Sequence, residues 1–180
     1  MSEIRHLSAT ELEQALPELV ATPSEMGRLD LIIRRPAENG RESIAEGRLS
    51  ESEGLEGDNW IRGRANPECQ LTLMNSRAAD LVAAGDRSRW ALAGDQLYVE
   101  FDLSDENLPA GTRVHIGNEA IVEVTAEPHT GCEKFISRFG IDAMKFVNSP
   151  QGRSLNLRGI NTKVIRGGVI RVGDELRKQD

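Results

Sequence analysis

The sequence predicts a mainly β protein: an antiparallel barrel with a few short helices. Strand signals recur along the chain, where β-branched and other apolar residues alternate with polar ones. These stretches are short and closely spaced, with few helices between them, which favours a barrel over a doubly wound sheet. The sequence contains neither a G-x-G-x-x-G run nor a P-loop, so the phosphate-binding turns of doubly wound folds are missing.

The first element is an N-terminal helix. Ser8 or Thr10 can cap a helix over residues 11–20, and Ser8 stands at capping-box spacing from Glu11. We expect Pro17 to break or bend this helix, because proline has no amide hydrogen for the helix interior.

The first strand is predicted over residues 28–34, ending before Pro36. The polar, glycine-rich stretch 39–64 that follows has no clear assignment, apart from a tight turn over 54–58. Beyond it, a strand over 70–74 should lead into a helix.

That helix is expected over residues 75–84, with Asn75 or Ser76 as its cap and Gly85 as its stop. The strongest strand signals follow the helix and continue towards the C-terminus. Gly117-Asn118 predicts a hairpin turn between two of these strands. They are expected over residues 95–103, 113–116, 120–125, 163–166, 168–172 and 175–177.

Two helical turns, over residues 134–139 and 141–147, should interrupt the β region, with Gly140 between them. Cys132 would stand just before the first turn, where the unpaired amides of a helix start stabilise an anion such as a thiolate. The helical pattern predicts that these apolar side chains belong to the core: Phe135, Ile136, Phe139, Met144 and Phe146.

The length of 180 residues fits one domain of ordinary size. Aromatic residues make up only 4% of the chain, which disfavours a stacking platform for single-stranded nucleic acid, so we expect no nucleic-acid partner. No apolar run approaches the roughly 20 residues of a membrane span, and the first residues lack the apolar core of a signal peptide. We therefore expect no membrane association and a cytoplasmic location.

The chain has two cysteines, Cys69 and Cys132, which form neither a disulfide framework nor a four-cysteine zinc site. Cys69 lies beside a predicted strand and is expected to be a small packed residue, with a Cys69–Cys132 disulfide as the alternative. Cys132 follows a glycine and stands among imidazole, hydroxyl and ammonium groups. Because nearby positive charge lowers the pKa of a cysteine, His129 and Lys134 make Cys132 a candidate reactive thiolate.

Basic residues are concentrated in the stretch 129–171, which holds eight Lys or Arg against two acids, although the whole chain has a net charge of −7. Such local positive charge favours a small anionic ligand over a nucleic-acid surface. A solvated basic surface is the alternative interpretation of the same count.

The ordered series of motifs in this half of the chain resembles the MOSC family, named for the C-terminal domain of molybdenum cofactor sulfurases. The resemblance covers most of the chain and also includes the turn over 54–58 and the strand 70–73. The residues that carry it are His129-x-Gly131-Cys132-x-Lys134-Phe135, Arg138-Phe139-Gly140, Asn148, Arg158-Gly159 and Gly173-Asp174.

The resemblance implies a MOSC-type β-barrel over residues 24–178, preceded by a helical extension over 1–23. It also implies an essential cysteine, here Cys132, that either carries sulfur as a persulfide or ligates molybdenum in a bound molybdopterin cofactor. Both roles need a deprotonated soft sulfur, so the sequence does not separate them.

For the cofactor, the resemblance and the residue chemistry together suggest a set of donors. Arg158, the first choice, and Arg138 offer planar forks for phosphate, and Lys134 offers a point charge. His129 could orient the thiol or exchange a proton, or could instead donate to a backbone carbonyl. The remaining candidates for cofactor contact are Thr130, Gly131 and Asn148.

Three functions follow as hypotheses. The first is a molybdenum-dependent enzyme that reduces N-oxygenated compounds, with Cys132 as metal ligand and an electron-donor protein as partner. The second is a sulfur carrier that receives sulfur on Cys132 from a cysteine desulfurase, a pyridoxal-phosphate lyase, since we expect no pyridoxal-phosphate site in this chain. The third is a non-catalytic binding module with a buried, inert Cys132. A second copy of the chain could complete the phosphate site in a homodimer.

Overall fold

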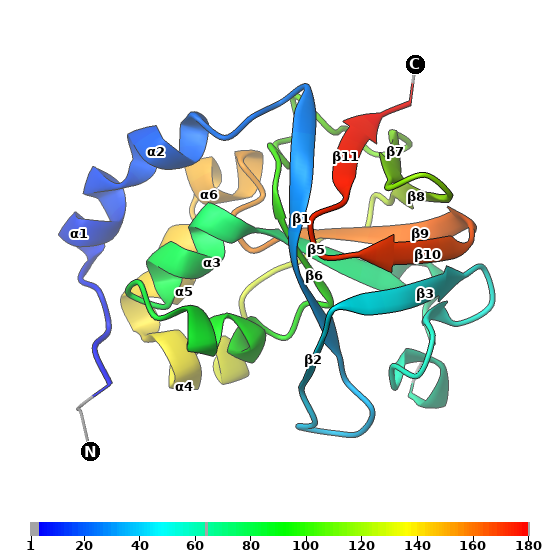
Figure 1. The fold of residues 1–180 in the computed structure, drawn as a ribbon. Helices are drawn as coiled ribbons and strands as arrows, with labels where there is room; N and C mark the ends of the chain where they lie inside the picture. Colours follow the sequence, from blue (N-terminus) through cyan, green and yellow to red (C-terminus); the bar gives the residue numbers. More distant parts are fainter. Residues whose placement is uncertain (1–3, 64, 180) are drawn as a thin grey trace.

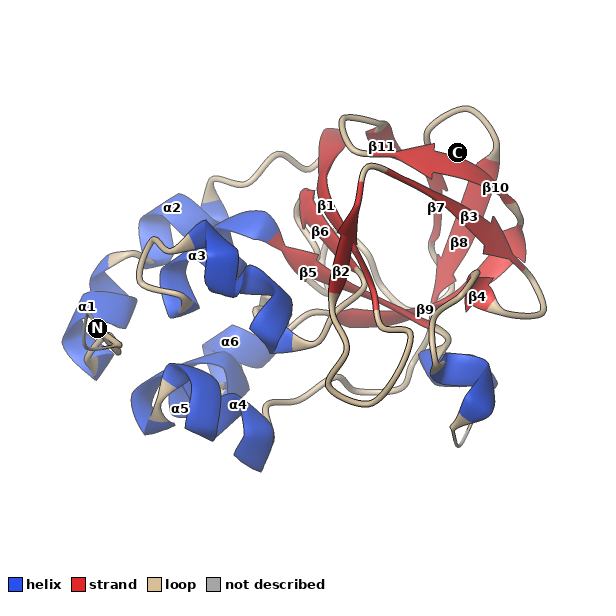
Figure 2. Cartoon of the chain, turned by 60° about the horizontal axis from the view of Figure 1, so that its bottom comes forward, coloured by secondary structure: helices blue, strands red, loops and turns tan. Residues whose placement is uncertain are grey.

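The computed structural model describes residues 4–63 and 65–179. It consists of a β-barrel with a group of helices against one side (Figures 1 and 2). Residues 1–3 of the expected N-terminal extension, and Arg64 at the end of the unassigned stretch, lie outside the described residues.

Seven strands close the barrel, in the order β11-β7-β8-β9-β5-β6-β1, with β1 pairing back to β11. The prediction of a mainly β barrel is therefore confirmed. The hairpin at Gly117 joins β7 to β8 as expected, with Gly117 at a positive φ of 63°. The seven strands are β1 (Met26–Arg34), β5 (Leu71–Asn75), β6 (Leu97–Glu100), β7 (Arg113–Ile116), β8 (Ala120–Val124), β9 (Ile160–Arg166) and β11 (Glu175–Lys178).

One pair departs from the antiparallel expectation, because β5 and β6 run parallel. Parallel neighbours need a long crossover, and the chain supplies it through α3 (Ser76–Val82) and the 3₁₀ helix η3 (Arg87–Ala93). The sequence predicted α3 with its Asn75 cap, and the Asn75 side chain accepts from the amides of Arg77 and Ala78. The helix η3 was not predicted.

The unassigned stretch forms short edge elements. The strand β2 (Glu42–Ile44) extends the barrel sheet beside β1. The predicted turn over 54–58 is only partly a turn, because its first two residues form the strand β4 (Gly54–Leu55) and pair with β3 (Glu46–Ser50). The second, three-stranded sheet contains β3 (Glu46–Ser50), β4 (Gly54–Leu55) and β10 (Gly168–Arg171), and η1 (Trp60–Arg62) and η2 (Pro67–Cys69) follow β4.

Two apolar clusters hold the molecule together. The first fills the barrel with aliphatic side chains and includes Phe101, which is fully buried. The second lies among the helices and includes Leu12, Leu19, Phe135 and Phe139. The helices around it are α1 (Ala9–Gln14), α2 (Leu16–Val20), α3, α4 (Glu133–Phe139), α5 (Ile141–Asn148) and α6 (Pro150–Ser154).

The local helix signals were read correctly from the sequence. Ser8 caps α1 and forms the capping box with Glu11, and the helical segment is interrupted so that Pro17 lies in the first turn of α2. Gly140, at a φ of 92°, separates α4 from α5. Of the predicted core residues, Phe135 and Phe139 are buried, whereas Ile136, Met144 and Phe146 are half-buried. The helix α6 was not predicted.

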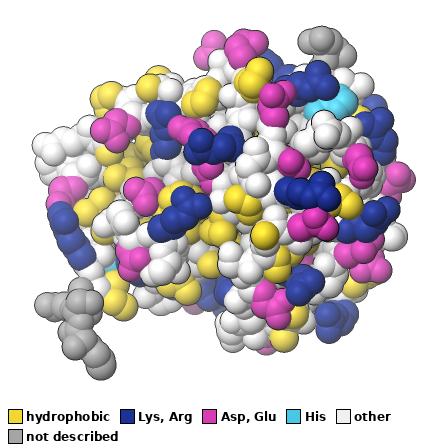
Figure 3. Space-filling model, viewed as in Figure 1, with side chains coloured by type: hydrophobic (Ala, Val, Ile, Leu, Met, Phe, Trp, Pro, Cys, Tyr) yellow, Lys and Arg dark blue, Asp and Glu magenta, His cyan; other side chains and the backbone are white. Residues whose placement is uncertain are grey.

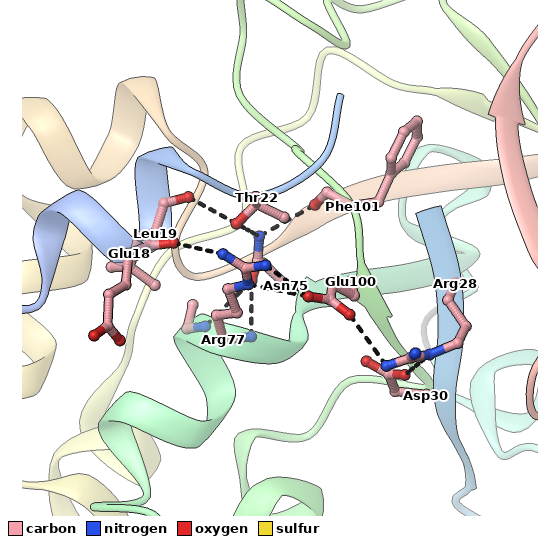
Figure 4. A network of polar contacts seen from close by, with 10 residues as sticks. Glu18, Leu19, Thr22, Arg28, Asp30, Asn75, Arg77, Glu100 and Phe101 are labelled. Atoms are coloured by element: carbon pink, nitrogen blue, oxygen red, sulfur yellow. Dashed lines mark hydrogen bonds and ion pairs between the residues drawn. The ribbon is translucent and has the colours of Figure 1, made fainter. Parts of the chain in front are cut away.

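A polar network joins the helices to the barrel (Figure 4). The Asn75 side chain donates to the Thr22 hydroxyl and to the Phe101 carbonyl oxygen, both at 3.1 Å. Beside it, Arg77 donates to the Glu100 carboxylate at 2.7 Å from the start of α3. These bonds fix the end of β5 and the start of α3 against the N-terminal helices.

On the face shown in Figure 3, basic and acidic side chains are interspersed, and hydrophobic side chains occur in small groups. Among the described residues, no helix has both the length and the apolar character that crossing a bilayer requires.

Candidate functional site

Cys132 is the residue before α4 and occupies its N-cap position, as the sequence predicted. Its carbonyl oxygen accepts from the amides of Phe135 and Ile136 at 2.9 and 3.1 Å, which starts the helix. The Cys132 side chain makes no capping bond and is exposed, and both Cys69 and Cys132 are free thiols. The third hypothesis is wrong in its premise, because it required a buried Cys132.

The backbone just before the thiol is held by Asn148, the last residue of α5. The Asn148 side chain accepts from the Gly131 amide at 2.9 Å and donates to the Gly131 carbonyl oxygen at 3.2 Å. A Cβ on residue 131 would lie only 3.2 Å from Met144 and 3.3 Å from the Asn148 amide nitrogen. The bonds between Gly131 and Asn148 therefore fix the position of the loop that carries Cys132. Both the oxygen and the nitrogen of the Asn148 side chain are used in these bonds.

The ring of His129 binds a carboxylate that the sequence analysis did not single out. The Nε2 atom of His129 lies 2.8 Å from Oδ1 of Asp95, and the Asp95 side chain is fully buried. Because an ionised carboxylate only accepts hydrogen bonds, His129 Nε2 carries the proton and donates. Within the described residues Nδ1 has no hydrogen-bond partner, so the ring of His129 bonds to Asp95 rather than donating to a backbone carbonyl.

The other oxygen of Asp95 binds Arg158, with 2.6 Å between Oδ2 and Nη1. Burial by itself raises the pKa of the Asp95 carboxyl, but the charge of Arg158 and the hydrogen bonds from His129 and Arg158 outweigh it. The net effect holds the pKa of Asp95 well below its usual range. Asp95 is therefore an anion at neutral pH, held between two donors.

Arg158 is bound inside the protein rather than presented as an open fork. Its Nη2 donates to the Ala93 carbonyl oxygen at 2.7 Å, and its guanidinium carbon lies 5.2 Å from the centre of the Phe135 ring. Its Nε is buried and has no hydrogen-bond partner in the described part of the chain. Of the residues proposed for phosphate, Arg158 is thus the most buried and the most fully engaged.

Gly159 makes room for this arrangement. It has a φ of 113°, and a Cβ there would lie 2.5 Å from the Leu73 carbonyl oxygen, 3.1 Å from His129 Cδ2 and 3.3 Å from Asp95 Oδ1. Any side chain at this position would push His129 and Asp95 apart. The two adjacent residues therefore have complementary roles. Arg158 neutralises the charge of Asp95, and Gly159 leaves the space in which Asp95 and His129 can meet.

A cavity of about 380 Å³ opens beside His129, a volume within the usual range of small-molecule sites. It lies between α6, the loop before α4 and the strands β8 and β9. The residues around it include Thr125, His129, Thr130, Arg153, Arg158 and Asn161.

The predicted residues fall into three groups. His129, Thr130 and Arg158 line this cavity, whereas Gly131 and Cys132 form the adjoining loop and Asn148 holds that loop from the end of α5. Lys134 is exposed, 3.9 Å from Glu38, and Arg138 donates to the Leu92 carbonyl oxygen; neither of these two lines the cavity.

The main residue that the sequence analysis missed is Asp95. It follows Gly94 and lies two residues before β6, and its partners are 34 and 63 positions away in sequence. Within residues 4–63 and 65–179, no cluster of three or more His, Cys, Asp or Glu could hold a metal ion.

The MOSC domain model matches residues 64–177, which contain Cys132, Asp95 and all the cavity residues. The chain belongs to the MOSC family. MOSC domains are associated with the molybdenum cofactor, so the family relates this domain to that cofactor in general terms.

Solved structures support the MOSC fold. The chain resembles YuaD from Bacillus subtilis with a TM-score of 0.62 and 15% identity, over 85% of this chain and 95% of that one. It resembles YiiM from Escherichia coli with a TM-score of 0.57 and 20% identity, over 85% and 70% of the two chains. For YiiM from Geobacillus stearothermophilus the TM-score is 0.58 at 14% identity, over 86% and 75%. No curated protein sequence matches the chain.

Replacing Asp95 tests the buried network of this MOSC chain. Asp95→Asn keeps the shape but leaves Arg158 buried without a counter-charge, so we expect a loss of about 3–5 kcal/mol in urea unfolding. The control is Glu46→Gln, which breaks the exposed Arg171–Glu46 pair and should cost at most about 1 kcal/mol. Equal losses of unfolding free energy in the two variants would show that the Asp95 network adds no more to stability than an exposed ion pair.

Acid should weaken the same network. Because the pKa of Asp95 is lowered by folding, the unfolded chain takes up this proton more readily than the folded one. The contribution of Asp95 to the free energy of unfolding is complete above about pH 3.9, the pKa of an aspartate in an unfolded chain. It is lost as the pH falls towards the lower pKa of Asp95 in the folded protein. Urea midpoints measured from about pH 7 to pH 3 should fall less steeply in Asp95→Asn than in the wild type. If the urea midpoints of the wild type and of Asp95→Asn fell equally with pH, the lowered pKa assigned to Asp95 would be contradicted.

Proposed function

We propose that this MOSC chain binds the molybdenum cofactor through the sulfur of Cys132 and reduces N-oxygenated compounds. The observation that carries the proposal is the exposed Cys132 thiol, fixed by the Gly131–Asn148 bonds and two residues beyond Thr130 at the cavity edge. A soft thiolate is the ligand type that suits such a metal.

The residues present fit the group. Cys132 offers one protein sulfur, and the absence of a multi-residue cluster in the described residues agrees with a metal whose other ligands belong to the cofactor. The cavity can accept a small molecule, and Arg138 and Lys134 lie on the same helix as the thiol for a phosphate group. When bound, the group supplies a two-electron metal centre able to remove one oxygen atom from nitrogen.

The chain's own residues then bind and protonate. Removing an oxygen atom as water consumes two electrons, which an electron-donor protein must supply, and two protons. His129 lines the cavity and relays protons, because Nδ1 first accepts a proton from solvent and then donates it. Asp95 holds Nε2, so proton exchange takes place at Nδ1. Gly131 and Asn148 keep the thiol in place.

Metal analysis tests the ligand assignment. Protein made in a host that synthesises molybdopterin should contain stoichiometric molybdenum. The affinity for the metal should fall at least about tenfold in Cys132→Ala, because even residues that only hydrogen-bond to a metal ligand contribute that much to metal affinity. Cys69→Ala is the matched control, since that thiol lies in η2 and should leave the metal content unchanged. Wild-type protein without molybdenum, or Cys132→Ala with a full complement, would refute the proposal.

A second candidate function is sulfur transfer, which the exposure of Cys132 favours, because another protein can reach this thiol. In that reaction the Cys132 thiolate attacks the outer sulfur of a donor cysteine persulfide on a desulfurase. A new S–S bond forms at Cys132, the donor's S–S bond breaks, and the donor cysteine leaves as a thiolate.

Intact-protein mass spectrometry distinguishes this candidate. After incubation with a desulfurase and free cysteine, the chain should gain one sulfur atom on Cys132, and a thiol reductant should remove it. The pKa of the Cys69 thiol is raised, by burial first and then by Glu127 and Glu68, so Cys69 should react more slowly. Sulfur found only on Cys69, or on neither cysteine, would exclude the carrier role.

A further inference from the structure

A second cavity, of about 320 Å³, lies between α2, α3, η3 and the strands β1 and β6. We call it the α3 cavity. Its volume is within the range of small-molecule sites, and it shares no lining residue with the cavity beside His129. Its walls on α2 and β1 precede residue 64, so they lie outside the part of the chain that the MOSC model matches. The charged residues that line it are Glu18, Arg28, Asp30, Arg77, Asp80, Arg87 and Glu100.

Most of these charges neutralise one another (Figure 4). Arg28 binds Asp30 at 2.7 Å and Glu100 at 3.1 Å. Glu100 also binds Arg77, at 2.7 Å. Glu18 is exposed, and Figure 4 shows its carboxylate pointing away from Arg77. The two paired arginines and their two acids therefore form a closed network along one wall of the cavity.

Two opposite charges remain, and both lie against the indole of Trp90. The guanidinium carbon of Arg87 is 4.6 Å from the centre of the Trp90 ring, so this cation lies over the ring. The Asp80 carboxylate accepts from Trp90 Nε1 at 3.1 Å, so this anion lies at the edge of the same indole. Among the residues that the structure describes, Arg87 and Asp80 form no ion pair with each other or with any other side chain.

The indole that separates these charges is held firmly. Trp90 is buried, and its carbonyl oxygen accepts from the Tyr98 hydroxyl at 2.8 Å. Arg87 is fixed on the other side by its Nη2, which donates to the Asp30 carbonyl oxygen at 2.9 Å. The cation and the anion are therefore kept near each other without being able to neutralise each other.

Both residues keep atoms for a ligand. In the described chain, Nε and Nη1 of Arg87 and Oδ2 of Asp80 have no hydrogen-bond partner. Arg87 is an exposed residue. Asp80 is half-buried, and its Oδ2 is not among the buried atoms that lack a partner, so solvent and ligands can reach it.

A buried hydroxyl in the same wall also lacks a partner. Ser76 lines the α3 cavity and is only 4% exposed, and its Oγ has no hydrogen bond within residues 4–63 and 65–179. Buried hydroxyls in folded proteins are nearly always hydrogen-bonded, because an unpaired one costs free energy. A polar group in the cavity would give Ser76 the partner that the protein does not supply.

We propose that the α3 cavity binds a free amino acid as its zwitterion, with the carboxylate on Arg87 and the ammonium group on Asp80. A guanidinium suits a carboxylate, and a ligand with both charges neutralises both residues at once. A simple anion or a simple cation would leave one of them unpaired. The rest of the lining includes Ala15, Leu19 and Leu81, which favour an aliphatic side chain. The site shares no residue with the loop of Cys132, so it does not depend on the proposed function.

Isothermal titration of the full chain tests this site with leucine and two analogues. Isoamylamine keeps the side chain and the ammonium group but lacks the carboxylate, whereas isocaproate lacks the ammonium group. Leucine should bind saturably, and each analogue should bind about tenfold more weakly or worse, the loss expected for one charge-assisted hydrogen bond. These comparisons use only the wild type, so they do not depend on how well any variant folds.

Two variants assign each charge to its residue. In Arg87→Gln the affinity for leucine should fall about tenfold, while the affinity for isoamylamine stays unchanged, because that analogue has no carboxylate for Arg87. In Asp80→Asn the affinity for leucine should fall similarly, while the affinity for isocaproate stays unchanged. Circular dichroism establishes that both variants are folded.

The cavity beside His129 supplies matched controls. Arg153 and Asp105 line that cavity and are exposed, and Asp105 also accepts from a side-chain nitrogen, that of Asn156, at 2.9 Å. Arg153→Gln and Asp105→Asn should leave leucine binding unchanged. The proposal would be overturned if leucine did not bind, if either analogue bound as tightly as leucine, or if the control variants lost as much affinity as Arg87→Gln and Asp80→Asn.

Discussion

The ionised carboxylate of Asp95, sealed between Arg158 and His129, is the constraint on which the rest of the site depends. A buried charge is tolerated only when its partners are fixed, and here each partner comes from a different element. Its bond to Arg158 ties the start of β6 to the start of β9, and its bond to His129 anchors the loop that leads to Cys132. The cavity and the cysteine loop therefore share one anchor.

Local signals in the sequence predicted local structure well. The Ser8–Glu11 capping box, the Asn75 cap, the Gly117 hairpin and the Gly140 break all depend on neighbours within a few residues, and all were confirmed. The alternation of apolar residues also identified the strands, since it reports directly which face is buried. The position of Cys132 before α4 followed from the same kind of local pattern.

Features set by distant contacts were not predictable in the same way. The parallel β5–β6 pair and η3 follow from how the crossover packs, and no motif marks them. Arg158 looked like an open phosphate ligand because its partner, Asp95, is 63 positions away. Asn148 looked like a ligand donor for the same reason, since only the folded chain places its amide against the Gly131 backbone. Residue type gave the chemistry of the site, whereas the fold decided which groups were already occupied.

Closure of the barrel has a consequence for how the molecule is made. The strand β1 pairs with β11. During synthesis, β1 therefore lacks this neighbour until the C-terminal strand β11 has been made. Pairings between such distant segments form slowly, because the entropy cost of closing a long loop comes before any stabilising contact is made. Until then one edge of β1 is unpaired and can associate with other chains. Nascent chains truncated before residue 175 should accordingly depend on chaperones far more than the released protein.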